Sequence, residues 1–200
     1  PRLDLPAKLD GSANYAGDIR LPDMVFASLR QGPIGESRVK SFNRDGARKI
    51  IGLIDVIDAK KWIAAVATNW WAANSALDKM SPVFETTGLL PDSIKMEAAL
   101  TDALEKGPGI RFVSRGETKP AFAEFENVEE RYQAEAAIHA PIETPTATAN
   151  FTDGRLELWM ATQAPAAAAK AAANALGILP EKVTLYQMLA GGSFGRTLDS

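Results

Sequence analysis

Three glycines stand within five residues near the carboxyl end of the chain, in the run Gly191-Gly192-Ser193-Phe194-Gly195-Arg196. This run follows a strand-like stretch, Lys182 to Met188. Glycine adopts backbone torsions that side chains forbid, and it lets main-chain N–H groups approach an anion or an oxo group closely. The pattern therefore predicts a loop whose amides bind a strongly polar group. The alternative is a tight turn without a ligand, because glycine clusters are common in proteins.

A second candidate for a polar contact is Gln163, which lies between a predicted strand at 155–161 and a predicted helix at 165–176. The free amides and the positive dipole end of a helix N-terminus favour an anionic group. The alternative is that the Gln163 side chain caps the first amides of its own helix. Thr162 has the same two interpretations.

The chain contains one histidine, His139, and Glu143 follows it four residues later. A metal site or proton relay on His139 would need partners that the sequence does not cluster around it. Glu143 stands between Pro141 and Pro145, which predicts a rigid turn where a carboxylate accepts backbone hydrogen bonds. We interpret both residues as structural, and we predict no metal-ligating side chain.

Apolar patterning and turn residues predict the elements that position these groups. A helix should begin after Asn69 and end at Ser81-Pro82, with Trp70, Ala73, Leu77 and Met80 on one face and at least one of the tryptophans Trp70 and Trp71 in the core. A further helix is predicted from about Ser93 to Lys106. Strands are predicted at 24–31, 50–57, 63–67, 110–113, 128–138, 146–151, 155–161 and 182–188.

Composition excludes several functions. The chain of 200 residues carries 22 basic and 25 acidic side chains and a net charge of −3, which gives no electrostatic footprint for nucleic acid. No stretch approaches the roughly 18 apolar residues of a membrane span, so we expect a soluble chain. Cysteine is absent, and iron–sulfur ligation within these residues is therefore excluded.

The order of motifs resembles the molybdopterin-binding subunit of the xanthine dehydrogenase and aldehyde oxidase family, especially its isoquinoline 1-oxidoreductase and aldehyde dehydrogenase branch. The carboxyl half carries His139-Ala140-Pro141-Ile142-Glu143, then Asp153-Gly154, then the segment around Gln163 and the glycine run. The amino-terminal half adds Pro1-Arg2-Leu3-Asp4, Asp10-Gly11-Ser12-Ala13-Asn14-Tyr15 and Asp18-Ile19-Arg20-Leu21-Pro22-Asp23-Met24.

This resemblance implies an α+β fold in three parts. Residues 1–85 would form an α/β hammerhead-like domain, residues 86–120 a helical connector, and residues 121–200 the N-terminal part of a molybdopterin-binding domain. The cofactor contacts would come from the glycine run and Gln163. In the family, the two amides that correspond to Phe194 and Gly195 point at an oxo ligand of molybdenum. Ser193 and Thr197 depart from the family pattern, where a glycine and an arginine are usual.

The family's chemistry is the hydroxylation of N-heteroaromatics or the oxidation of aldehydes, with water as the oxygen donor. The resemblance implies molybdopterin cytosine dinucleotide as cofactor, a separate 2Fe–2S subunit and an electron acceptor as partners, and either a periplasmic or a cytoplasmic location. The family's catalytic glutamate lies in a Gly-x-Gly-Glu motif, which these residues lack. We therefore expect an inactive piece without catalytic residues or bound cofactor. The alternative is a stand-alone hammerhead-like module for binding or assembly.

Overall fold

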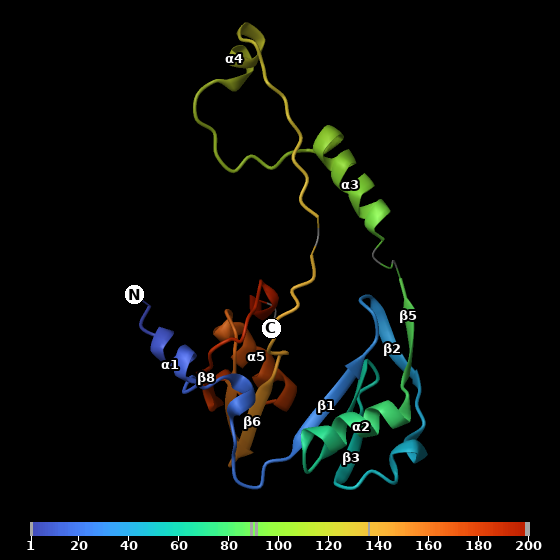
Figure 1. Ribbon diagram of the computed structural model, residues 1–200. Coiled ribbons are helices and arrows are strands. Elements are labelled where there is room, and N and C mark those ends of the chain that lie inside the picture. The colour runs from blue at the N-terminus through green and yellow to red at the C-terminus, as the bar shows by residue number, and fades with distance from the viewer. Residues whose placement is uncertain (1, 89, 91, 136, 199–200) are drawn as a thin grey trace. The chain divides into compact units, whose positions relative to one another are not determined.

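The computed structural model describes residues 2–88, 90, 92–135 and 137–198. The chain divides into two compact units: unit 1 comprises Pro1–Leu21 and Glu130–Ser200, and unit 2 comprises Pro22–Glu129 (Figure 1). Helices and strands are mixed in both units, and the predicted α+β class is correct. The predicted domain limits of 1–85, 86–120 and 121–200 stay a prediction, because compact units group residues by contact alone.

Unit 2 contains two small antiparallel sheets. One has the order β1-β4-β3, with β1 at Phe26–Gln31, β3 at Leu53–Asp58 and β4 at Trp62–Ala67. The other pairs β2, Glu36–Ser41, with β5, Val83–Thr87. Helix α2, Trp70–Met80, lies across the first sheet (Figure 1), and Asn69 caps it by accepting a 2.9 Å hydrogen bond from the Ala72 N–H. The predicted start and end of this helix are confirmed.

Small side chains let α2 approach the sheet closely. The largest fully buried side chains are Ile63, Leu77 and Met80, and alanines fill the space around them: Ala65, Ala67, Ala72, Ala73 and Ala76. The prediction that a tryptophan of α2 belongs to the core is wrong. Trp70 is 53% exposed and Trp71 is 73% exposed, because the alanines occupy the face that packs on the strands.

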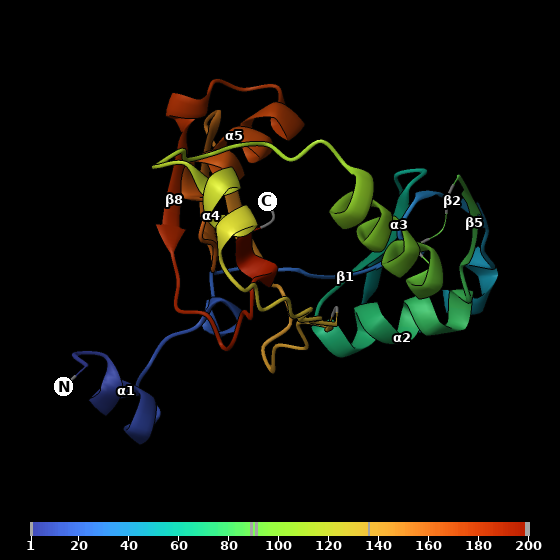
Figure 2. The same ribbon diagram turned by 90° about the horizontal axis from the view of Figure 1, so that it is seen from above.

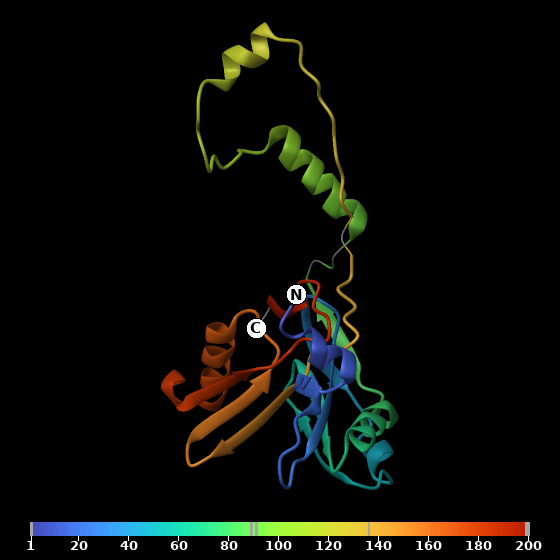
Figure 3. The same cartoon turned by 60° about the vertical axis from the view of Figure 1, so that its left-hand side comes forward.

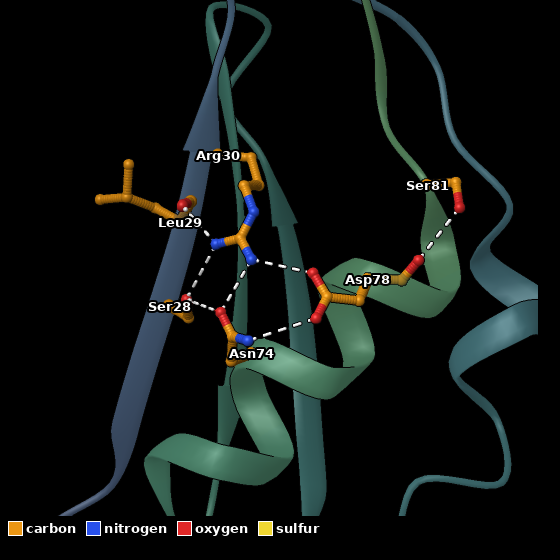
Figure 4. A network of polar contacts seen from close by, with 6 residues as sticks. All are labelled: Ser28, Leu29, Arg30, Asn74, Asp78 and Ser81. Atoms are coloured by element: carbon orange, nitrogen blue, oxygen red, sulfur yellow. Dashed lines mark hydrogen bonds and ion pairs between the residues drawn. The ribbon is translucent and has the colours of Figure 1, made fainter.

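A polar network joins the edge strand β1 to α2 (Figure 4). The Arg30 guanidinium donates to Asn74 Oδ1 at 2.7 Å and to Asp78 Oδ1 at 2.9 Å. Ser28 Oγ donates to the same Asn74 oxygen at 3.3 Å. These bonds fix the position of α2 along β1. Apolar contacts between small alanines alone would restrain that position only weakly.

Unit 2 ends in two helices, α3, Ser93–Lys106, and α4, Thr118–Glu124. They carry exposed large apolar side chains: Ile94, Met96, Leu100, Leu104 and Phe122. The bounds of α3 match the prediction, but no residue of it is buried. Residues 107–117 form neither helix nor strand. The strands predicted at 110–113 and 128–138 are wrong for the described residues there, whose exposed backbone pairs with no neighbouring strand.

Unit 1 is built on a three-stranded sheet with the order β6-β7-β8 (Figure 3). Strands β6, Ala147–Thr152, and β7, Arg155–Met160, form an antiparallel hairpin through Asp153-Gly154, where both residues have positive φ. Strand β8, Val183–Gln187, runs parallel to β7. A parallel pair needs a crossover, and α5, Pro165–Leu176, supplies it against one face of the sheet.

The ends of α5 follow directly from its sequence. Pro165 occupies the first turn, where no N–H is needed, and Gly177 ends the helix with φ 66°. The other face of the sheet carries Trp159 stacked on Tyr186, with ring centroids 5.0 Å apart. The Tyr186 hydroxyl donates to Glu157 at 2.9 Å, and this bond raises the pKa of Tyr186.

Helix α1, Leu5–Asp10, has no buried residue and lies apart from the sheet of unit 1 (Figure 2). A short 3-10 turn at Ala16–Asp18 follows it, and Ala16 is buried. Tyr15 then forms a parallel bridge with Leu189, just before the glycine run. None of the described helices is long and apolar enough to span a membrane.

Replacing a buried side chain of α2 should cost far more stability than replacing an exposed one of larger size. We expect Leu77→Ala to lower the free energy of unfolding by about 2–5 kcal/mol, because it leaves a cavity between α2 and the sheet. Trp71→Ala should change it by less than about 0.5 kcal/mol. Urea denaturation followed by circular dichroism measures both values. A larger cost for Trp71→Ala would contradict the packing described for α2.

The segment 107–117 should be the first site of limited proteolysis. Its side chains are exposed, and no backbone pairing restrains it. We expect trypsin to cut at Arg111 and Arg115 before it cuts at Arg48 or Lys61. Mass spectrometry of a digestion time course identifies the cuts. Early cleavage within residues 26–80 with protection of 107–117 would show that the exposed segment is packed.

Candidate cofactor-binding site

The parallel arrangement of β7 and β8 brings the two predicted site segments to the same edge of the sheet. Gln163 follows the end of β7, and the glycine run follows the end of β8. The Met188 N–H donates to the Met160 carbonyl at 3.0 Å, so the pairing continues to this edge. Ligands of open α/β sheets commonly bind outside the carboxyl ends of strands. The fold thus places Gln163 and residues 189–197 together.

The loop formed by residues 189–197, here called the glycine loop, has the backbone torsions that its glycines predict. Gly192 and Gly195 both have φ of 102°, and Phe194 has φ of 51°. Ser193 has no positive φ, so its Cβ adds no backbone strain. Within the described part of the chain, no hydrogen bond reaches the N–H groups of Phe194 and Gly195. Two consecutive amides are therefore available for a ligand.

Space around the loop explains why Gly195 has no side chain. A Cβ at Gly195 would lie 3.2 Å from His139 Nε2, in addition to the strain of its positive φ. The neighbouring Phe194 is 74% exposed. His139 is thus a neighbour of the loop, which agrees with the structural role interpreted from the sequence but adds a contact that the sequence did not reveal.

The carboxyl end of the loop is fastened by hydroxyl and amide groups. Ser193 Oγ and Thr197 Oγ1 are 2.6 Å apart, and Thr197 Oγ1 donates to Gln163 Oε1 at 3.1 Å. The Gln163 backbone N–H also donates to the Thr197 carbonyl at 2.9 Å. The two departures from the family pattern, Ser193 and Thr197, are therefore bonded to each other. They hold the loop against the start of α5.

The two interpretations of Thr162 and Gln163 can now be separated. Thr162 is buried, and its hydroxyl accepts a 3.0 Å hydrogen bond from the Ala164 N–H at the start of α5. Thr162 thus serves its own helix. Within the described residues, Gln163 forms its hydrogen bonds with Thr197 rather than with the first amides of α5.

The amino end of the loop is fastened by a carboxylate. Glu143 accepts a 2.7 Å hydrogen bond from the Gly191 N–H and a 3.1 Å hydrogen bond from the Gly17 N–H. Sequence reasoning predicted that this carboxylate accepts backbone hydrogen bonds, and the structure confirms it. The sequence did not reveal Gly17 as a partner of Glu143 or Thr197 as a partner of Gln163, because neither residue carries a local signal of its role.

The cofactor implied by the resemblance fits these residues. The two free amides belong to Phe194 and Gly195, which both have positive φ. A Cβ at Gly195 would crowd His139 beside the loop. Fixed N–H dipoles of this kind stabilise a negative or strongly polar group. No cluster of three or more histidine and carboxylate side chains suited to a metal ion occurs among the described residues.

Comparison with known proteins supports the resemblance. The sequence profile of the molybdopterin cofactor-binding domain matches residues 104–199, which include the glycine loop and Gln163. This carboxyl-terminal part of the chain is therefore similar to that cofactor-binding family. The isoquinoline 1-oxidoreductase subunit beta of Brevundimonas diminuta is 27% identical over all of this chain. The xanthine dehydrogenase of Emericella nidulans is 22% identical over 98% of it. The predicted resemblance is confirmed.

Solved structures show the same fold. Quinoline 2-oxidoreductase from Pseudomonas putida superposes over 98% of this chain and 30% of its own, with a TM-score of 0.67 and 19% identity. Aldehyde oxidoreductase from Desulfovibrio gigas superposes over 98% of this chain and 27% of its own, with a TM-score of 0.69 and 20% identity. The chain spans 27% of the isoquinoline enzyme's subunit and 16% of the xanthine dehydrogenase.

Removing the Thr197 hydroxyl should loosen the glycine loop. Thr197→Val deletes the bonds to Ser193 and Gln163 at almost constant volume, and we expect a loss of about 0.5–1.5 kcal/mol in the free energy of unfolding. The matched control is Thr184→Val on β8, where the threonine is exposed and valine suits a strand. Urea denaturation of both variants measures the difference. Equal stability of the two variants would contradict the role of Thr197.

Proposed function

We propose that this chain forms part of the cofactor cleft of a molybdenum hydroxylase-type oxidoreductase. The observation that carries the proposal is the pair of free amides at Phe194 and Gly195, within the residues that match the molybdopterin-binding domain. The substrate class would be N-heteroaromatic compounds or aldehydes. Its support is the similarity to proteins named for isoquinoline, nicotinate, quinoline and aldehyde substrates.

The residues of this chain would bind and orient the cofactor. Gly192, Ser193, Phe194, Gly195 and Arg196 would surround a polar part of it, while Gln163 holds the loop in place through Thr197. When bound, the cofactor supplies the two-electron redox centre at which oxygen from water is transferred to the substrate. The amides of Phe194 and Gly195 would stabilise negative charge there, since fixed dipoles need no reorganisation during the reaction.

Other parts of the proposed enzyme lie outside these 200 residues. We propose that the general base is a glutamate in a Gly-x-Gly-Glu motif, which this sequence lacks. We also propose the cytosine dinucleotide form of the cofactor and a separate 2Fe–2S subunit that passes electrons to an acceptor. The absence of cysteine from this chain agrees with such a division.

The proposal predicts a large effect of Gly195→Val on turnover in the full-length protein. Valine is strained at a φ of 102° and its Cβ would meet His139, so the Phe194 and Gly195 amides should shift. We expect turnover per bound molybdenum to fall about 100-fold, the usual cost of one misplaced donor. Elemental analysis and a steady-state assay with an aldehyde and with an N-heteroaromatic substrate measure it.

The matched control for this variant is Gly154→Val in the turn between β6 and β7. Gly154 also has a positive φ, of 72°, but a Cβ there would meet no atom within 4 Å. Both variants therefore carry backbone strain of about 1–3 kcal/mol, and only one displaces the loop amides. Equal turnover per molybdenum in the two variants would contradict the placement of the function on the glycine loop. We expect the 200-residue chain alone to retain no stoichiometric molybdenum.

A further inference from the structure

We infer that Glu143 is a positioning residue, whose carboxylate sets where the glycine loop lies and so where its free amides point. The inference about loop position stands on contacts within unit 1. Its consequence for the cofactor rests on the proposed function.

Glu143 and Gly191 are joined through both of their backbones and through the carboxylate. Glu143 Oε2 accepts from the Gly191 N–H at 2.7 Å, and the Glu143 N–H donates to the Gly191 carbonyl at 3.2 Å. Glu143 Oε1 accepts from the Gly17 N–H at 3.1 Å. Hydrogen bonds to an ionised acceptor are stronger than neutral ones. One carboxylate thus connects the 3-10 turn near the amino terminus, the turn at 139–143 and the glycine loop.

The reason for glycine at position 191 follows from this contact. A Cβ at Gly191 would lie 2.5 Å from Glu143 Cβ and 3.0 Å from Glu143 Oε2. Gly191 has no positive φ, in contrast to Gly192 and Gly195. Its N–H is already bonded to Glu143, so we assign Gly191 to the attachment of the loop and leave the binding of a ligand to Phe194 and Gly195.

Neighbouring residues hold Glu143 at this point. Pro141 and Pro145 flank it and fix their own φ angles, which limits the turn that carries the carboxylate. On the other side, the Asp18 carboxylate accepts the Tyr15 N–H at 2.9 Å and closes the turn that presents the Gly17 N–H. Glu143 itself is half-buried. The donor groups and the acceptor are therefore both preorganised.

The loop between its two attachments is short, so a change at one end must reach the amides. Glu143 holds Gly191, Gln163 holds Thr197, and only residues 192–196 lie between them. A chain of five residues spans at most about 16–18 Å when extended, and this loop is turned. Losing the Glu143 carboxylate bond leaves only the 3.2 Å bond from the Glu143 N–H to the Gly191 carbonyl to hold the end that leads to Phe194 and Gly195.

The variant Glu143→Gln tests the inference with the least change in shape. The glutamine amide offers one acceptor oxygen, while its NH₂ group faces an N–H donor, so one of the two carboxylate bonds must be lost. The matched control is Glu157→Gln on β7, because Glu157 also accepts two hydrogen bonds in unit 1, from Tyr186 and Asn150, without touching the loop. Amide exchange of the 200-residue chain is measured by NMR for each protein.

We expect the Gly191 or Gly17 amide to exchange at least about 10-fold faster in the Glu143→Gln variant than in the control, the loss expected for a bond to a charged acceptor. The amides of β6, β7 and β8 should exchange at the same rate in both. Unchanged exchange at Gly191 and Gly17 would overturn the inference. An equal rise over all of unit 1 would also overturn it, since Glu143 would then contribute only to global stability.

The full-length protein supplies the second arm. We expect Glu143→Gln to change the molybdenum electron paramagnetic resonance spectrum, recorded per bound molybdenum, while Glu157→Gln leaves it as in the wild type. Identical spectra in all three proteins would contradict the positioning role. Wild-type protein without molybdenum would refute the proposed function, whereas the exchange result on the 200-residue chain would still decide whether Glu143 positions the loop.

Discussion

One carboxylate accepts hydrogen bonds from two backbone amides that are far apart in sequence, and the geometry of the glycine loop depends on it. Glu143 lies 126 residues from Gly17 and 48 residues from Gly191. Each bond joins residues that are far apart in the chain, and bringing such residues together costs conformational entropy. The Glu143 carboxylate thus fixes the amino end of the loop through backbone donors alone. Among the described residues, the N–H groups of Phe194 and Gly195 keep no hydrogen-bond partner.

The second constraint is topological. Strands β7 and β8 are parallel, so the crossover helix α5 carries the chain back to the end of the sheet where β7 begins, and both strands then end on the same side. Gln163 and the glycine loop follow the two strand ends and meet there, although Leu189, the first residue of the loop, lies 26 positions after Gln163 in the sequence. Gln163 then contacts Thr197 rather than capping α5, and Thr162 takes the capping role. The candidate site is thus formed by two segments, one after β7 and one after β8.

Local signals predicted the elements with strong ends. Pro165 and Gly177 delimit α5 through their own backbone torsions, and the Asn69 side chain caps the first turn of α2. The predictions of strands at 110–113 and 128–138 were wrong for the described residues there. A strand needs a neighbouring strand to pair with, and apolar composition does not show whether one is present. Strands β2 and β5 were missed because only Val39 and Phe84 of these strands pack against the core, among residues that are mostly polar. The partners of Glu143 could not be predicted, since they depend on contacts across the whole unit.

The central claim is that the Phe194 and Gly195 amides, free in the protein itself, receive a polar group of the molybdopterin cofactor. Hydrogen–deuterium exchange of these two amides, in full-length protein with and without bound cofactor, tests it most directly. We expect exchange at both positions to slow by at least about 10-fold on cofactor loading, as for amides that gain a hydrogen bond to a charged acceptor. The amides of β8 should not change. Equal exchange at Phe194 and Gly195 in loaded and cofactor-free protein would contradict the claim.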